Sequence, residues 1–197
     1  MVEIRMVELE HFLLHQYSKR HHTDKSCIDE SVSGMFDILL ENKFDMNSVG
    51  TGGPLFCLMI DMRSLLSIGI VIKMVNGGLD FGHTHMKGVA HKKLLRELEF
   101  KYSNTLWSVF VYICQHTNFV ETIPSGSEIF GLLFGKFTIS KDGVYSDYVC
   151  QPCTINMILA ADNEHTIKKE LLKKYNFSLR QCIKQRYPEI FNAILNN

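Results

Sequence analysis

The sequence has no net charge and no long apolar run. Its 197 residues carry 21 Lys and Arg against 21 Asp and Glu, and this balance excludes a generally basic nucleic-acid binder of the histone type and an acidic solvating tail. The longest apolar stretch, 65–75, contains Ser67, Gly69 and Lys73, so it falls well short of the roughly 20 apolar residues that cross a bilayer. With 46% hydrophobic residues, the length favours a single packed domain over disorder.

The N-terminus lacks the features of a secretory signal. Residues 1–8 alternate charged and apolar side chains, without the basic start, apolar centre and cleavage site of a signal peptide. We therefore expect a soluble protein made in the cytosol and located in the cytoplasm or the nucleus. A removed signal, or export by a non-standard route as a secreted effector, stays open.

Nothing in the cysteine pattern calls for disulfide bonds. Six cysteines stand at positions 27, 57, 114, 150, 153 and 182. Cys57 and Cys114 lie within apolar runs, where a free thiol behaves as a small buried hydrophobe. Because disulfides are rare in the cytosol and the nucleus, we expect reduced thiols.

Helical periodicity is the main positive signal. Four blocks carry apolar residues at helix spacing, and three of them end in Asn or Gly, which cap helix C-termini. A second apolar element, headed by Pro or Thr as is typical of a helix start, precedes each of the last three blocks. The blocks are 35–47, 70–81, 129–139 and 167–177, and the preceding elements are 53–59, 104–110 and 153–161. The predicted unit is turn, helix, short loop, helix and turn.

Two segments resemble ankyrin repeats. Residues 39–47, Leu-Leu-Glu-Asn-Lys-Phe-Asp-Met-Asn, resemble the ankyrin phrase leucine, leucine, glutamate, x, glycine, alanine, aspartate, valine, asparagine. Residues 53–56, Gly-Pro-Leu-Phe, resemble the threonine-proline-leucine-histidine that follows it. Residues 75–81 repeat the first phrase 35 residues later, near the family's period of roughly 33. The anchors at 54, 105 and 154 are 51 and 49 residues apart, which implies insertions at 82–103 and 141–152.

The resemblance implies an all-α fold, an ankyrin-like helical solenoid with irregular insertions. A helix pair cannot bury its own apolar stripe, so such units stack and share a core. We expect a single domain over 1–197, with units at 11–50, 51–103, 104–152 and 153–177 and a C-terminal helical cap at 178–197. Strand signals are scarce: 136–140 and 143–149 form either a small hairpin or a long ordered loop.

Motifs for catalysis and cofactor binding are absent or incomplete. There is no glycine-x-serine-x-glycine elbow, and the glycine-rich turn before the second unit lacks the residues that complete a phosphate loop. Cys150 and Cys153 have the spacing of a zinc or redox pair. Zinc needs two further ligands, for which His83, His85 and His91 are the candidates; the competing interpretation is two reduced thiols leading into a helix. We expect no enzyme activity, no cofactor and no metal.

The resemblance also implies a binding function. Ankyrin-repeat proteins bind partner proteins on the concave face formed by their turns and inner helices. We therefore expect a non-catalytic, monomeric protein–protein interaction module, a scaffold for another protein, with no membrane partner. Alanine at the contact positions should leave folding intact and weaken binding. The predicted contact residues are Asp45, Asn47, Thr51, Asp80, His83, His85, Thr138 and Asp142.

Two alternatives to a protein-binding function remain. One is a nucleic-acid- or phosphate-binding helical protein that uses its basic C-terminal helices, although the neutral total charge disfavours nucleic acid. The other is a zinc- or thiol-dependent regulator at Cys150 and Cys153.

The charge is unevenly distributed along the sequence. The net charge is −5 over 1–61, +4 over 62–103, −3 over 104–162 and +4 over 163–197. Stacked units would place these blocks in space as alternating bands, with the basic C-terminal end facing an acidic partner.

Overall fold

The structure is a computed structural model of the 197-residue chain. It describes residues 4–20, 22–100, 103–124, 133, 137–140, 143–146, 152–162, 166–173, 188 and 192. The described residues form eight helices and two small two-stranded sheets, so the protein is mostly helical and the predicted all-α class is confirmed.

The elements follow one another in a regular order. The helices are α1 (Met6–Lys19), α2 (Lys25–Glu41), α3 (Leu55–Asp61), α4 (Ile68–Asn76), α5 (Val89–Phe100), α6 (Asn104–His116), α8 (Pro152–Ala161) and α9 (Thr166–Lys173). The strands are β1 (Val49–Gly50), β2 (Gly53–Pro54), β3 (Phe137–Ser140) and β4 (Gly143–Ser146), each sheet being one antiparallel pair.

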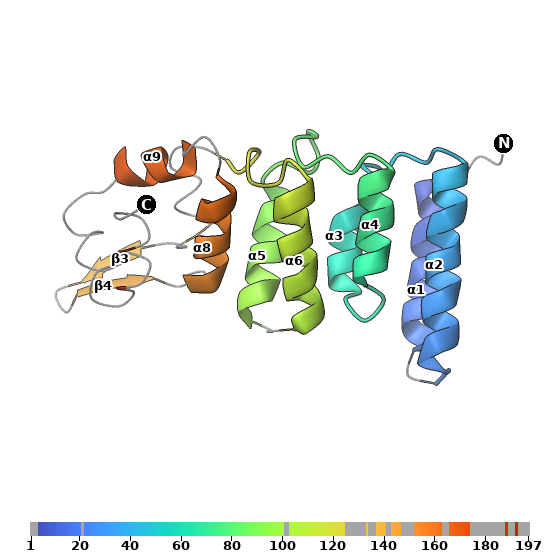
Figure 1. The fold of residues 1–197 in the computed structure, drawn as a ribbon. Coiled ribbons are helices and arrows are strands. Elements are labelled where there is room, and N and C mark those ends of the chain that lie inside the picture. Colours follow the sequence, from blue (N-terminus) through green and yellow to red (C-terminus); the bar gives the residue numbers. More distant parts are fainter. Residues whose placement is uncertain are drawn as a thin grey trace.

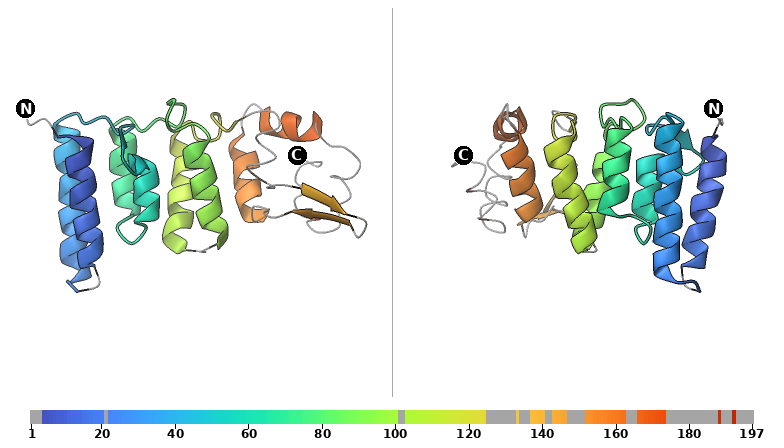
Figure 2. Two further views of the ribbon diagram at one scale, coloured as in Figure 1. Left: turned by 180° about the vertical axis from the view of Figure 1, so that it is seen from behind. Right: turned by 45° about the vertical axis from the view of Figure 1, so that its right-hand side comes forward.

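Helices α1–α6 and α8 stand side by side in a row that is two layers deep over α1–α6, and α9 lies across its end (Figures 1 and 2). In one layer α2, α4, α6 and α8 each contact the next, and in the other α3 contacts α5. Helix α1 packs on α2, and α5 packs on α6. The chain reversals therefore gather along two opposite edges of the row. We call the edge that carries residues 42–54, 77–88 and 117–124 the turn edge; it is uppermost in Figure 1.

Local sequence explains why the helices of one layer begin where they do. Asp24, Ser67 and Ser103 stand immediately before α2, α4 and α6. Each side-chain oxygen accepts a hydrogen bond from a backbone N–H in the first turn of its helix, as these residue types do at helix starts.

An aromatic chain connects successive helix pairs within the core. The rings of Phe56 and Phe81 lie 5.1 Å apart between centroids, and those of Phe81 and Phe119 lie 5.0 Å apart, both edge to face. Phe110 meets Phe119 in the same way at 6.1 Å. All four side chains are fully buried. Edge-to-face contact adds to the stabilisation that burial provides, so the units share one core.

Backbone geometry recurs at 35-residue intervals along the turn edge. Lys43 and Gly78 follow α2 and α4 with φ of 55° and 90°. Gly53 and Gly88 precede α3 and α5 with φ of 105° and 77°. Glycine adopts this left-handed region without strain, and it occupies three of the four positions. The repeat in the sequence is thus matched by a repeat in the chain path.

Side-chain turns recur at the same interval. The Asp45 carboxylate accepts a hydrogen bond from the Asn47 N–H at 2.9 Å, and the Asp80 carboxylate accepts one from the Gly82 N–H at 2.8 Å. Aspartate fixes turns in this way by binding the backbone two residues on. The two aspartates of the ankyrin-like phrase therefore have the same structural role.

The predicted insertion at 82–103 is wrong. Residues 89–100 form α5, which lies in the layer of α3 and pairs with α6, so α6 is the second helix of its pair and not the first. The apolar positions of α5 are at helix spacing and buried: Ala90, Leu94, Leu95 and Leu98. Charged residues between them hid this pattern. Likewise α8, predicted as a first helix, contacts α6 and lies in the layer of second helices.

The remaining predicted elements have mixed outcomes. The small hairpin is confirmed, because β3 pairs with β4 in antiparallel register. Its first strand occupies the end of the helix predicted at 129–139, of which only residue 133 is described as helical. Helix α9 matches the predicted block at 167–177 in its first half. The cap at 178–197 lies outside the described residues, apart from positions 188 and 192, which are helical.

Candidate functional site

Six of the eight predicted contact residues lie on the turn edge. Asp45, Asn47 and Thr51 belong to the turn between α2 and α3, and the next three, at positions 80, 83 and 85, belong to the turn between α4 and α5. Thr138 lies apart from them, in β3 opposite Tyr145. Asp142 is outside the described residues. The structure therefore brings most of the predicted surface to one edge.

Asn47 connects two neighbouring turns. Its side-chain amide donates a hydrogen bond to the Gly78 carbonyl at 3.0 Å, and its carbonyl oxygen accepts one from the Asp80 N–H at 2.8 Å. Both polar atoms of the amide thus bind the following unit. Asn47 is half-buried, and its role in this arrangement is to hold adjacent turns in register.

Asn118 repeats this connection one unit later. Its amide donates to the Asp80 carboxylate at 2.6 Å, and its carbonyl oxygen accepts from the Phe81 N–H at 3.1 Å. The bond from Asn118, followed by the bond from the Gly82 N–H, holds the pKa of the Asp80 carboxyl below its usual value. Sequence reasoning missed Asn118, because its partners are 37 and 38 residues away.

Glu10 is a buried carboxylate that binds the turn between β1 and β2. It is 3% exposed. It accepts hydrogen bonds from the Thr51 N–H at 3.1 Å, the Thr51 hydroxyl at 2.8 Å and the Gly52 N–H at 2.9 Å. Burial raises the pKa of this carboxyl, but the bonds from Gly52 and Thr51 outweigh burial, so its pKa lies below the usual value. A Cβ atom on Gly50 would collide with the carboxylate, which explains the glycine.

These bonds change what the predicted contact residues are expected to do. Asn47, Thr51 and Asp80 hold the fold together, so we now expect their alanine variants to lose stability, whereas the sequence alone predicts intact folding. His85 is exposed and remains open to a partner. His83 is half-buried; its ring lies 5.6 Å from that of His85, and its buried Nδ1 atom has no hydrogen-bond partner among the described residues.

His91 is a core residue and not a ligand. Its side chain is fully buried and stacks on Phe119 with ring centroids 4.4 Å apart. Nδ1 accepts from the Gly88 N–H at 3.2 Å, so Nε2 carries the proton that it donates to the Phe119 carbonyl at 2.7 Å. Burial lowers the pKa of the imidazole to about 4, so the ring is neutral at physiological pH.

The described residues give little support to a metal site or a reactive thiol. Cys57 and Cys114 are buried free thiols, and burial raises their pKa to about 11 and about 12. Cys153 is exposed at the start of α8, while Cys150 lies outside the described residues. Within the part of the chain that is described, no three His, Cys, Asp or Glu side chains are grouped to hold a metal ion.

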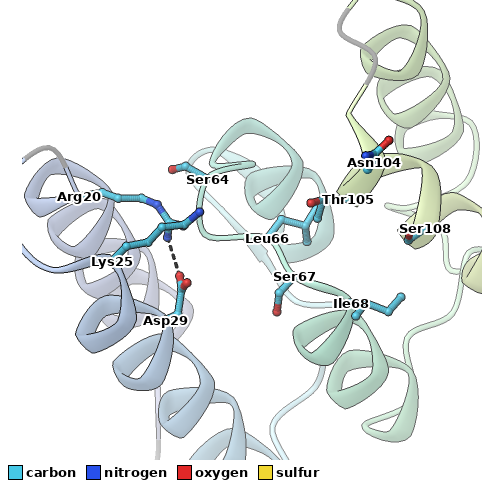
Figure 3. A pocket seen from close by; sticks show the side chains of 10 residues that line it. All are labelled: Arg20, Lys25, Asp29, Ser64, Leu66, Ser67, Ile68, Asn104, Thr105 and Ser108. Atoms are coloured by element: carbon cyan, nitrogen blue, oxygen red, sulfur yellow. Dashed lines mark hydrogen bonds and ion pairs between the residues drawn. The ribbon is translucent and has the colours of Figure 1, made fainter.

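A hollow of about 370 Å³ lies on the edge opposite the turn edge (Figure 3). It opens where α2, α4 and α6 begin. Arg20 and Asp29 form an ion pair there at 2.7 Å, and the Arg20 side chain is 12% exposed. Its charge is therefore already neutralised within the fold. The lining residues are Arg20, Lys25, Asp29, Ser64, Leu66, Ser67, Ile68, Asn104, Thr105 and Ser108.

No protein-family model, curated protein or solved structure matches this chain. Function must therefore be inferred from the chain itself. None of the helices in the described ranges is both long enough and apolar enough to cross a membrane.

Proposed function

We propose that this protein is a non-catalytic protein–protein interaction module, built as a single-domain ankyrin-like solenoid. The observation that carries the proposal is the 35-residue recurrence of turn geometry in a row of helix pairs. Residues 88–91, Gly-Val-Ala-His, stand 35 positions after Gly-Pro-Leu-Phe at 53–56. His91 thus occupies the histidine position of the threonine-proline-leucine-histidine phrase, which extends the ankyrin resemblance into a third unit.

The turn edge and the layer of α1, α3 and α5 form the proposed binding side. Hydrogen bonds between the turns and the side chains of Asn47, Asn118 and Glu10 fix the turns before any partner arrives. A preorganised surface binds more tightly, because less conformational entropy is lost on association.

Exposed apolar side chains favour the same side. Seven large apolar side chains are exposed among the described residues, and five of them belong to α1, β1 or the start of α5. Apolar and aromatic anchors of this kind supply much of the energy in protein interfaces. The five are Val7, Leu14, Tyr17, Val49 and Val89.

The perturbed titratable groups support a non-catalytic role. His91 is neutral, buried and bonded on both nitrogens. The raised pKa of Cys57 and Cys114 leaves almost no thiolate at neutral pH, and the thiolate is the reactive form. Strongly perturbed groups in an active site are tuned for reaction, whereas these three are packed into the core.

Affinity capture followed by mass spectrometry tests the proposal. The double variant Leu14→Asp/Val89→Asp places two charges on the proposed side. Its matched control, Ile38→Asp/Ile68→Asp, places two on the layer of α2 and α4, where both side chains are also exposed. We expect a specific partner to bind the wild type and the control and to be lost from the first variant. Capture of no partner, or equal loss from both variants, would contradict the proposal.

A further inference from the structure

The basic charge of block 62–103 is divided into paired and unpaired cations. Arg63 binds Glu97 at 3.2 Å, Lys73 binds Asp37 at 2.7 Å, and Lys93 binds Asp61 at 2.5 Å. The other described cations of this block make no ion pair with any residue whose side chain the structure describes. They are Lys87, Lys92 and Arg96, and all three are exposed.

Two of the three unpaired cations, Lys92 and Arg96, lie on one face of α5, together with Lys93, which is paired with Asp61. Val89, Lys92, Lys93 and Arg96 are spaced i, i+3, i+4 and i+7, so they share one side of the helix. The opposite side is the buried one that faces the core. Seven residues of helix span about 10 Å. We call these four residues the basic α5 face; Lys87 precedes it in the turn, and Val89 is 53% exposed at its start.

The helices beside this face add no unpaired charge to it. Helix α3 carries one charged residue, Asp61, which is paired with Lys93, and α6 carries no Lys, Arg, Asp or Glu. The exposed cations described here are therefore confined to α5 and the turn before it. This small footprint suits the few carboxylates of a short acidic segment, whereas nucleic-acid binding depends on many phosphate contacts, which favours an acidic peptide over nucleic acid.

We propose that the basic α5 face docks a short acidic segment of a partner protein. The carboxylates of that segment bind Lys92 and Arg96, and an apolar side chain packs on Val89. The planar Arg96 guanidinium offers a two-point contact to a carboxylate. Lys87 extends the cationic surface toward the turn edge, where the exposed His85 lies. This inference rests on the proposed function and names the chemistry of the partner. It places the contact with an acidic partner on α5, whereas the sequence alone predicts it at the basic C-terminal end.

Fluorescence anisotropy with three labelled probes tests this proposal on the full chain. The first is a 12-residue peptide with four Glu and a central Leu, the second has Gln in place of each Glu, and the third is a 12-nucleotide single-stranded RNA. The variant Lys92→Glu/Arg96→Glu is compared with Lys19→Glu/Lys25→Glu, which changes the net charge equally at exposed positions far from α5. Circular dichroism checks that both variants keep the wild-type helix content.

We expect the acidic peptide to bind the wild type and the control alike, and to bind Lys92→Glu/Arg96→Glu at least tenfold more weakly. Rising salt should weaken the binding, and the Gln peptide should not bind. No binding of the acidic peptide, or equal binding to both variants, would overturn the proposal, as would RNA binding as tight as that of the peptide. A partner from the affinity capture that survives Lys92→Glu/Arg96→Glu would also overturn it while leaving the interaction module intact.

Discussion

The turn edge and the basic α5 face are both polar, but their polar groups have different partners. On the turn edge, the side chains of Asn47, Asn118 and Glu10 are hydrogen-bonded to turns of neighbouring units. On α5, the side chains of Lys92 and Arg96 are exposed and make no ion pair with any residue whose side chain the structure describes. The polar side chains therefore serve two purposes: those of the turn edge maintain the spacing of the units, and those of α5 are open to a partner.

This difference teaches how polar turn residues should be interpreted. Asp, Asn and Thr in turns between helices look like contact residues, yet these types also bind nearby backbone groups. A hydrogen-bonded side chain must break its internal bonds before it can bind a partner, and that breakage costs free energy. An exposed charged side chain without an internal partner, in contrast, loses only its hydration when it binds a partner. Substitutions on the turn edge should thus act on stability, and substitutions on α5 should act on binding.

The largest effect should come from Glu10. Glu10→Ala removes an anionic acceptor and leaves the N–H groups of Thr51 and Gly52 without their partner. Hydrogen bonds to charged groups contribute about 1.5–3 kcal/mol each, so we expect the free energy of unfolding to fall by about 4 kcal/mol. Urea unfolding followed by circular dichroism measures the change.

The matched variant Glu10→Gln keeps one carbonyl acceptor at the same place. It should lose about 2 kcal/mol, roughly half of the alanine effect, because one oxygen becomes a donor that faces a donor. If both variants were as stable as the wild type, the turn edge would not depend on this buried acid.

The free energy of unfolding should depend on pH because of His91. Burial lowers its pKa in the folded state from 6.5 to about 4, so the unfolded chain binds the extra proton first. The contribution of His91 is fully present above pH 6.5 and declines as the pH falls toward 4. We expect a loss of about 3 kcal/mol between pH 7.5 and pH 4, since each pKa unit corresponds to about 1.4 kcal/mol. Urea titrations at a series of pH values measure it.

His91→Phe separates this effect from other titrations. Phe56 stands 35 positions earlier in the equivalent place of the preceding unit, so a phenyl ring suits the position. The variant should be less stable at pH 7.5 by about 2 kcal/mol, because the Gly88 N–H loses its acceptor. The free energy of unfolding of this variant should also lose most of its pH dependence between pH 6.5 and 4.5. Hydrogen bonds lower the pKa of Glu10 and of Asp80 in the folded state, so the stability that these carboxylates contribute is lost mainly below that window.

The Asn47 bridge should have a smaller effect. Asn47→Ala removes two bonds between adjacent turns, which should lower the free energy of unfolding by about 2 kcal/mol. Asp45→Ala, two residues away and exposed, fixes only its own turn and should cost less than about 1 kcal/mol. A binding defect in folded Asn47→Ala, with unchanged stability, would mean that this residue contacts the partner directly.

Local patterns in the sequence predict much of the helical fold. Helix spacing of apolar residues identifies the segments of α2, α4, α6 and α8, and the glycine-bearing turns identify the 35-residue repeat. Helix α5 was missed because cationic residues interrupt its apolar positions, although Leu94, Leu95 and Leu98 keep the helical period. Counting 35 residues on from 53–56 leads to His91 at the start of this helix, so the signal was present.

The contacts of the candidate site are less accessible to sequence reasoning. Glu10 binds residues 41 and 42 positions away, and Asn47 binds residues 31 and 33 positions away. Such pairs depend on how the units stack, which no local pattern encodes. The same holds for the cations of block 62–103: their number can be read from the sequence, but only the packed helices separate those paired with carboxylates from those left open.

Substitutions on the basic α5 face should have the smallest effect on stability. They test the difference between the turn edge and α5 most directly. Lys92→Ala/Arg96→Ala removes no ion pair and buries nothing, so the free energy of unfolding should change by less than about 0.5 kcal/mol. Lys93→Ala breaks a partly exposed pair with Asp61 and should cost less than about 1 kcal/mol. In the acidic-peptide assay, the double variant should nevertheless weaken binding more than Asn47→Ala does. The reverse order would mean that the acidic segment binds at the Asn47 turn and not on α5.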